Sequence, residues 1–124
     1  MASETRVRRV EEAIKAEIGA LLVKGLKDPR IGFVSIMAVR VSPDLRSANV
    51  YVSLYGSESE KKSSLAGLRS SAGFVRKHVG TVLRLRFAPE IRFFEDNTLD
   101  EVYRLEQVFK EIRDEEGAPA DDDE

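Results

Sequence analysis

Apolar residues recur every three or four positions in three stretches of the chain, which places them on one face of a helix. The first stretch runs from near Thr5 to near Leu26, with Thr5 or Ser3 available as the N-cap. The second spans residues 65–82 and the third spans residues 99–111. Three amphipathic helical segments are therefore expected, each with one face toward a core.

Extended segments are predicted between these helical stretches. Residues 31–41 are rich in β-branched and apolar side chains, and residues 48–55 alternate between apolar and polar positions, which is typical of a half-buried strand. The turn-forming residues 42–47 between them predict an antiparallel hairpin. A third, short strand is expected at residues 91–94. This pattern favours an α+β domain of two layers, a three-stranded sheet with helices packed on one face.

The second helical stretch contains a glycine near its middle, in the run Ser71-Ala72-Gly73. Glycine costs about 1 kcal/mol relative to alanine in a helix interior, so we expect two helices joined by a kink at this run. The hydroxyl of Ser71 could favour the bend, because serine can hydrogen bond to a carbonyl of the preceding turn.

Charge is distributed unevenly along the chain, although the formal net charge is only −2. Residues 60–94 carry eight basic and two acidic side chains, a net +6, whereas residues 95–124 carry three basic and thirteen acidic ones, a net −10. Within the helix pair the basic residues repeat at intervals of seven, so they should form rows beside the apolar face. Such rows predict contact with a polyanion, and arginine binds phosphate oxygens especially well.

The residues predicted to bind RNA are the basic side chains of the helix pair and of the first helix. They are Arg6, Arg8, Arg9, Lys61, Lys62, Arg69, Arg76, Lys77, Arg84 and Arg86. The three arginines of the first helix allow two interpretations, a solvated first turn or a nearby anionic partner, because a helix N-terminus is already partly positive. On the open face of the sheet, Tyr51, Tyr55, Arg92 and Phe94 would either stack on bases or pack together under a terminal helix.

The sequence offers little for catalysis, metal binding or membrane insertion. It has no cysteine and a single histidine, His78, which argues against a multi-histidine metal site. Neighbouring carboxylates occur without a base or nucleophile placed to complete a site, and there is no phosphate-binding glycine-rich loop. No apolar run approaches the roughly 20 residues that span a bilayer, and nothing resembles a signal peptide. We therefore expect a soluble, cytoplasmic protein that is not an enzyme and uses no cofactor or small-molecule substrate.

Several motifs, taken in order and spacing, resemble the bacterial ribosome-binding factor A family from Arg6 to about Phe109. The matching segments are Asp28-Pro29-Arg30, Val41-Ser42-Pro43-Asp44-Leu45, Ala48-Asn49-Val50-Tyr51-Val52, Gly73-Phe74-Val75-Arg76, Leu83-Arg84-Leu85-Arg86 and Pro89-Glu90-Ile91-Arg92-Phe93-Phe94-Glu95-Asp96-Asn97. The resemblance implies a KH-like fold of the second type that lacks the GxxG loop and has an Ala-x-Gly kink instead. Here Ser71 stands where the family has its first alanine.

The resemblance also implies a function, that of a monomeric ribosome assembly factor without catalytic activity. Such a factor binds the small (30S) ribosomal subunit and its 16S rRNA, promotes late maturation of this RNA, including its 5′ end, and supports growth in the cold. The residues alone leave an alternative, a protein-interaction module whose basic face docks an acidic protein partner. We expect residues 1–113 to form one RNA-binding domain and residues 114–124, which end in four carboxylates, to be a disordered acidic tail.

Overall fold

The computed structural model describes residues 3–96 of the chain. Its elements are α1 (Glu4–Lys24), β1 (Val34–Val41), β2 (Ser47–Leu54), α2 (Glu58–Ser70), α3 (Ala72–Val82) and β3 (Glu90–Glu95). Up to the third strand this is the predicted order. The helix predicted at residues 99–111 and the tail predicted at residues 114–124 lie outside the described residues, so both stay predictions.

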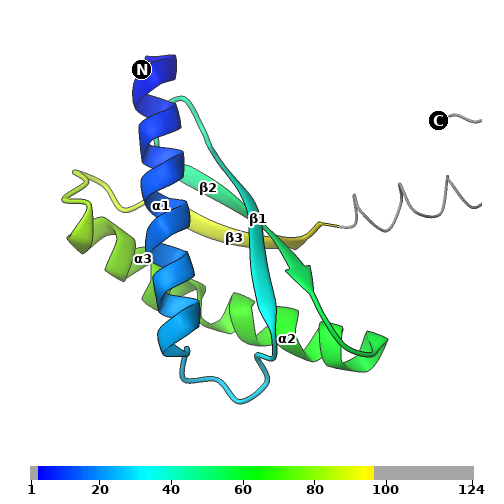
Figure 1. Cartoon of the computed structure of the whole chain (residues 1–124). Helices are drawn as coiled ribbons and strands as arrows, with labels where there is room; N and C mark the ends of the chain where they lie inside the picture. The colour runs from blue at the N-terminus through cyan, green and yellow to red at the C-terminus, as the bar shows by residue number, and fades with distance from the viewer. Residues whose placement is uncertain (1–2, 97–124) are drawn as a thin grey trace, which may run out of the picture.

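The three strands form one sheet in the order β1-β2-β3. The β1–β2 pair is the predicted antiparallel hairpin, whereas β2 and β3 are parallel. Parallel neighbours need a crossover connection, and α2 and α3 together provide it. All three helices pack on the same face of the sheet. Helix α1 crosses the strands, whereas α2 and α3 follow each other along β3 (Figure 1).

The first strand begins at Val34, three residues later than predicted. The reason is that the backbone just before Val34 hydrogen bonds to other segments and not to β2. The N–H of Ile31 donates to the carbonyl of Asp28 at 3.1 Å, and the N–H of Gly32 donates to the hydroxyl of Ser64 on α2 at 2.9 Å. This segment therefore fastens α2 to the domain instead of extending the sheet.

A bulge in β1, not predicted from the sequence, adjusts which residues face the core. The pairing with β2 shifts between Ile36 and Ala38, so Met37 is an extra residue in the strand. Ile36 and Val39 both pack with the core although they are three positions apart. The bulge thus keeps a continuous apolar face where strict alternation would have turned it outward.

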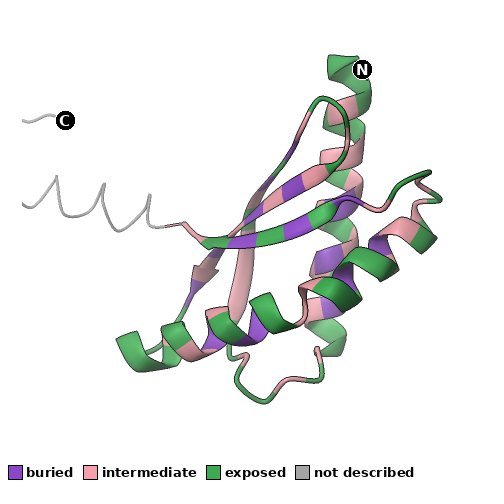
Figure 2. Ribbon diagram, turned by 180° about the vertical axis from the view of Figure 1, so that it is seen from behind, coloured by how far each residue is buried: buried purple, intermediate pink, exposed green. Residues whose placement is uncertain are grey.

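The core lies between one face of the sheet and the three helices, as the buried stripes of Figure 2 show. Its buried members are Ile14, Ile18, Leu21, Val39, Val41, Ala48, Val50, Val52, Leu54, Leu68, Val75, Val79, Ile91 and Phe93. The predicted inward face of β2 is confirmed at all four positions. Val82, predicted on the apolar face of the helix pair, is instead 45% exposed, because α3 ends there and Leu83 packs against the core in its place.

Both ends of α1 have clear physical causes. Ser3 is the N-cap, and its hydroxyl accepts a hydrogen bond from the N–H of Arg6 at 3.2 Å. The helix ends at Lys24, two residues before the predicted end, because Gly25 adopts a φ of 93°. Midway along α1, the carboxylate of Glu11 accepts from the N–H of Val41 at 2.9 Å, which holds the helix across the end of β1.

Candidate nucleic-acid interface

The predicted kink lies between α2 and α3, at Ser71. The N–H of Ser71 donates to the carbonyls of Gly67 and Leu68, and its hydroxyl donates to the carbonyl of Gly67 at 3.0 Å. The residue thus closes α2 with its own side chain, which is the backward hydrogen bond expected from the sequence. Among residues 3–96, no side chain caps the start of α3.

The glycine that matters for packing is Gly67 rather than Gly73. A Cβ on Gly73 would meet nothing within 4 Å, and Gly73 is a regular residue of α3. A Cβ on Gly67 would lie 2.7 Å from Cγ1 of Ile31, which is closer than real contacts allow. Gly80 is similarly tight against Ala88, at 2.7 Å. The predicted junction at this run is therefore confirmed, but Gly73 itself takes no special conformation, and the close approach lies six residues earlier, at Gly67 in α2.

Two lysines of the predicted RNA-binding set are fully available to a ligand. Lys62 on α2 and Lys77 on α3 are exposed, and within residues 3–96 neither makes a hydrogen bond or an ion pair. Lys61 differs, because its amine lies 3.7 Å from the carboxylate of Glu58 and its side chain is only 20% exposed. Lys62 and Lys77 can therefore bind phosphate without breaking an internal contact.

Two arginines of the set have structural contacts as well as charge. The guanidinium of Arg69 donates two hydrogen bonds, of 3.3 and 3.1 Å, to the carbonyl of Phe93 in β3. Arg76 donates from Nε to the carbonyl of Ala88 at 3.1 Å. Each guanidinium has five N–H donors, so donors remain for a phosphate after these contacts. Both side chains join the helix pair to the chain segment around β3.

A cluster at one end of the domain combines arginines with an exposed aromatic ring. The guanidinium carbons of Arg46 and Arg86 lie 4.9 and 5.5 Å from the centre of the Phe87 ring, which is 55% exposed. Arg84, in the same loop, is exposed and has a left-handed backbone, with a φ of 53°. We call Arg46, Arg84, Arg86 and Phe87 the loop arginine cluster. Two guanidinium groups beside one ring repel each other, so an anion that contacts both would be stabilising.

Arg46 and Phe87 were not predicted as site residues. They meet because the N–H of Glu90, at the start of β3, donates to the carbonyl of Arg46 at 2.9 Å, which joins the hairpin turn to the α3–β3 loop. The run Arg84-Leu85-Arg86-Phe87 does carry a signal, an aromatic residue beside two arginines. Nothing in the sequence points to Arg46, because its position depends on the parallel pairing of β2 and β3.

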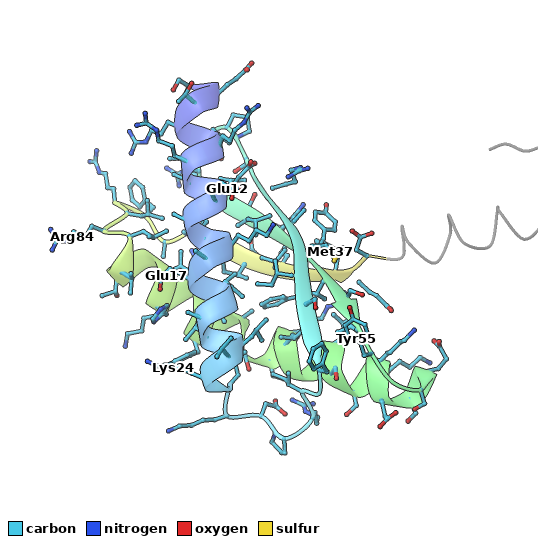
Figure 3. All side chains as sticks on the ribbon, viewed as in Figure 1. Glu12, Glu17, Lys24, Met37, Tyr55 and Arg84 are labelled. Atoms are coloured by element: carbon cyan, nitrogen blue, oxygen red, sulfur yellow. The ribbon has the colours of Figure 1, made fainter. Side chains whose placement is uncertain are left out.

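The predicted set does not form a single patch. Arg6, Arg8 and Arg9 occupy the first turns of α1, whereas Lys61 and Lys62 lie on the first turns of α2, and these two helix ends are at opposite ends of the domain (Figures 1 and 2). Arg84 projects outward beyond the end of α3, well away from the start of α2 (Figure 3). A ligand that contacts all of these positions must be as long as the domain.

On the open face of the sheet, Tyr51 and Phe94 stack with ring centres 5.6 Å apart and planes 27° apart. Arg92 donates to the carboxylate of Glu90 at 2.9 Å. Tyr55 lies beyond the end of β2 and packs edge-on against Phe33, at 5.1 Å. Tyr51, Arg92 and Phe94 therefore lie in the sheet, each with a partner of its own. Tyr55 belongs to a separate aromatic pair.

In the part of the chain that the structure describes, no group of three or more histidine, aspartate or glutamate residues is placed to hold a metal ion. His78 lies with Nε2 3.0 Å from a carboxylate oxygen of Glu17 on α1. None of the helices within residues 3–96 has the length and apolar character needed to cross a membrane.

Comparison with known proteins adds to this geometry. The family model described as ribosome-binding factor A matches residues 6–109. The chain belongs to the ribosome-binding factor A family. Among curated relatives of that name, the Geobacter metallireducens protein is 54% identical over 112 residues, which cover 90% of this chain and 95% of the relative. The Brevibacillus brevis protein is 44% identical over 110 residues, which cover 89% and 91% of the two chains.

Solved structures of ribosome-binding factor A proteins share the fold. A solution NMR structure from Thermotoga maritima aligns with a TM-score of 0.66 and 39% identity over 77% of this chain and 92% of that one. A Thermus thermophilus ribosome-binding factor A homology model, fitted into a cryo-EM map of a 30S complex, aligns with a TM-score of 0.54 and 25% identity over 73% and 91% of the two chains. The α+β, KH-like fold expected from the sequence is confirmed, with a helix junction where a GxxG loop would otherwise lie.

Proposed function

We propose that this protein is a ribosome assembly factor that binds the small (30S) ribosomal subunit and promotes late maturation of 16S rRNA, including its 5′ end. The observation that carries the proposal is the match to the ribosome-binding factor A family over residues 6–109, together with relatives of that name that align along nearly their whole length. The basic side chains of α2, α3 and the α3–β3 loop, several of them unpaired within residues 3–96, supply a surface for the RNA.

The charges favour recognition of the RNA backbone and shape. Lys62 and Lys77 are exposed and unpaired within residues 3–96, and the loop arginine cluster adds guanidinium groups at the far end of α3. Such side chains bind phosphate without reading sequence. Double-stranded RNA is recognised in this way, because its deep major groove keeps side chains away from the base edges.

Promotion of maturation requires that the protein bind one conformation of the subunit more tightly than another. A protein shifts such an equilibrium only by its difference in affinity for the two states. A hundredfold preference for the immature conformation corresponds to about 2.8 kcal/mol. The long, divided basic surface suits this role, since a rearrangement of the RNA would remove some contacts and leave others. No catalytic step is needed, and we expect a monomer that acts in the cytoplasm and supports growth in the cold.

Sedimentation of cell lysate, with detection of the protein across the ribosomal fractions, tests the proposal. We expect comigration with free small subunits and not with translating ribosomes. Replacing Lys77 and Arg84 with glutamate should abolish most of this comigration, and the slope of log affinity against log salt for purified small subunits should fall by about two. Arg76 is left intact because its hydrogen bond to Ala88 holds α3 in place.

A matched control distinguishes the effect of these two positions from the effect of a changed net charge. Replacing Lys15 and Arg40 with glutamate changes the charge by the same amount at positions on α1 and β1, outside α3 and the α3–β3 loop. Equal weakening by both pairs of substitutions would mean that no particular face is used. Unchanged binding of the variant with Lys77 and Arg84 replaced would move the interface elsewhere.

The alternative function, docking of an acidic protein partner, uses the same charges. The two functions differ in whether added RNA should displace the protein from small subunits. Purified ribosomal RNA should displace the protein from small subunits if RNA is the ligand, with a steep loss of affinity as salt rises. Insensitivity to added RNA would favour the acidic protein partner.

A further inference from the structure

A pocket lies where the C-terminal end of α1 meets the junction of α2 and α3. Its volume is about 670 Å³, and Leu21, Leu26, Phe74 and His78 contribute to its lining. This volume falls within the roughly 300–1,000 Å³ that is usual for sites of small ligands. The pocket is separate from the loop arginine cluster, which lies beyond the other end of α3.

Two aromatic rings of α3 form a platform in this pocket. Phe74 is 60% exposed, and its ring is stacked on that of His78, with ring centres 6.4 Å apart and planes 24° apart. The imidazole is held in turn by Glu17, whose carboxylate lies 3.0 Å from Nε2. The platform is therefore oriented by a contact to α1 while most of the phenylalanine surface stays open to another planar group.

The charged groups of the lining favour an anion. Lys24 and Lys27 both line the pocket, at the end of α1 and just after it. Figure 3 shows Lys24 and Glu17 on the same flank of α1. Among the described residues, Asp28 is the one carboxylate of the lining, and Arg30 offsets its charge at 2.7 Å. Within residues 3–96, the two lysines thus remain available to a phosphate.

Two hydroxyl groups at the helix junction complete the lining. The oxygen of Ser70 accepts a hydrogen bond from Arg30 at 2.9 Å, so its own hydrogen is free to be donated. The hydroxyl of Ser71 donates to the carbonyl of Gly67, so its oxygen can still accept. The lining therefore offers both a donor and an acceptor, which is what the edge of a base requires.

We propose that this pocket takes one unpaired nucleotide of RNA, with its base stacked on Phe74 and its phosphate beside Lys24 and Lys27. The inference rests on the proposed function, since it supposes an RNA partner. It adds recognition of one unpaired nucleotide to a surface that is otherwise suited to contacts with the RNA backbone. Stacking on an exposed aromatic ring is how proteins commonly hold unpaired bases. A peptide could use the lysines, but it would leave the open ring face without a planar partner.

The chain contains no tryptophan, so Phe74→Trp places a single fluorescent reporter in the pocket. A short single-stranded oligoadenylate should quench this fluorescence to saturation, whereas an RNA duplex of the same length should quench little. Phe33→Trp is the matched control, because Phe33 is also exposed, at 72%, but lies in another part of the surface. Quenching of both reporters alike, or of neither, would overturn the proposal.

Affinity provides a second measurement. Phe74→Ala should weaken binding of the same oligoadenylate roughly five- to a hundredfold, and Phe74→Tyr should restore most of it, as expected for loss and return of one stacked base. Phe33→Ala should have no effect. If Phe74→Ala leaves oligoadenylate binding intact, the nucleotide pocket is refuted. Weaker binding to small subunits without any effect on the oligonucleotide would refute it too, and would assign the pocket to a ribosomal protein.

These outcomes are separable from those of the proposed function. Comigration with small subunits and its loss on replacing Lys77 and Arg84 do not depend on Phe74. If comigration is observed and the Phe74→Trp protein is not quenched, the nucleotide pocket fails and the assembly role stands. If saturable quenching is observed and the protein never comigrates with small subunits, the pocket stands and the assembly role fails.

Discussion

Alanine substitutions at Gly67 and Gly73 should change stability in opposite directions. Both residues lie in helices, where replacement of glycine by alanine contributes about 0.4–1 kcal/mol by restricting the unfolded chain. At Gly73 nothing lies within 4 Å of the new methyl group, so Gly73→Ala should stabilise the domain by that amount. In a domain of this size, 1 kcal/mol corresponds to a rise in Tm of about 4–8 °C.

At Gly67 the new methyl group would lie 2.7 Å from Cγ1 of Ile31 and 3.2 Å from Cγ of Asp28. These atoms lie near the backbone of a segment that hydrogen bonds to α2, so they cannot move away freely. Overpacking of this kind costs about 1–3 kcal/mol, which exceeds the helical gain. Gly67→Ala should therefore lower the free energy of unfolding by about 1–2 kcal/mol, as measured by urea denaturation.

A double-mutant cycle tests the cause. Ile31→Ala removes the atom with the shortest contact, so Gly67→Ala should cost much less in an Ile31→Ala background than in the native protein. Equal costs in both backgrounds would show that the contact with Ile31 is not responsible. Equal stabilisation by Gly67→Ala and Gly73→Ala would refute the assignment of the close approach to Gly67.

Three further predictions concern the same region and the tail. Ser64→Ala should destabilise by about 1–3 kcal/mol in urea denaturation, because it leaves the N–H of Gly32 and the carbonyl of Arg30 without their hydroxyl partner. Hydrogen bonds from Arg30 lower the pKa of Asp28 to about 2, so the stability that this carboxylate contributes should be present above pH 4 and lost as pH falls toward 2; an Asp28→Asn protein should lack that part of the pH dependence, and an unchanged profile would contradict it. Deleting residues 117–124 should tighten binding of non-specific RNA at low salt if the acidic tail competes for the basic surface, with no shift in Tm, whereas equal affinities would leave it a solubilising tail.

The sequence by itself determined the type and order of the elements within residues 3–96. The spacing of three and four residues in the helices and the strict alternation at Ala48, Val50, Val52 and Leu54 are local patterns, so they could be interpreted without knowing what each segment packs against. The junction at Ser71 was predictable for the same reason, since it depends on side-chain chemistry within one turn. The family resemblance then gave the fold, because the order and spacing of its motifs carry information that no single motif holds.

Other features depend on contacts between distant segments, and only the tertiary structure decided them. The importance of Gly67 over Gly73 comes from the crossing of α2 over Ile31, a contact that helical periodicity cannot reveal. The meeting of Arg46 with Phe87 requires the parallel pairing of β2 and β3, and the pocket at Phe74 requires the end of α1 to lie against the helix junction. The basic rows were visible in the sequence, but their use was not: Arg69 and Arg76 also hold backbone carbonyls, whereas Lys62 and Lys77 remain free within residues 3–96.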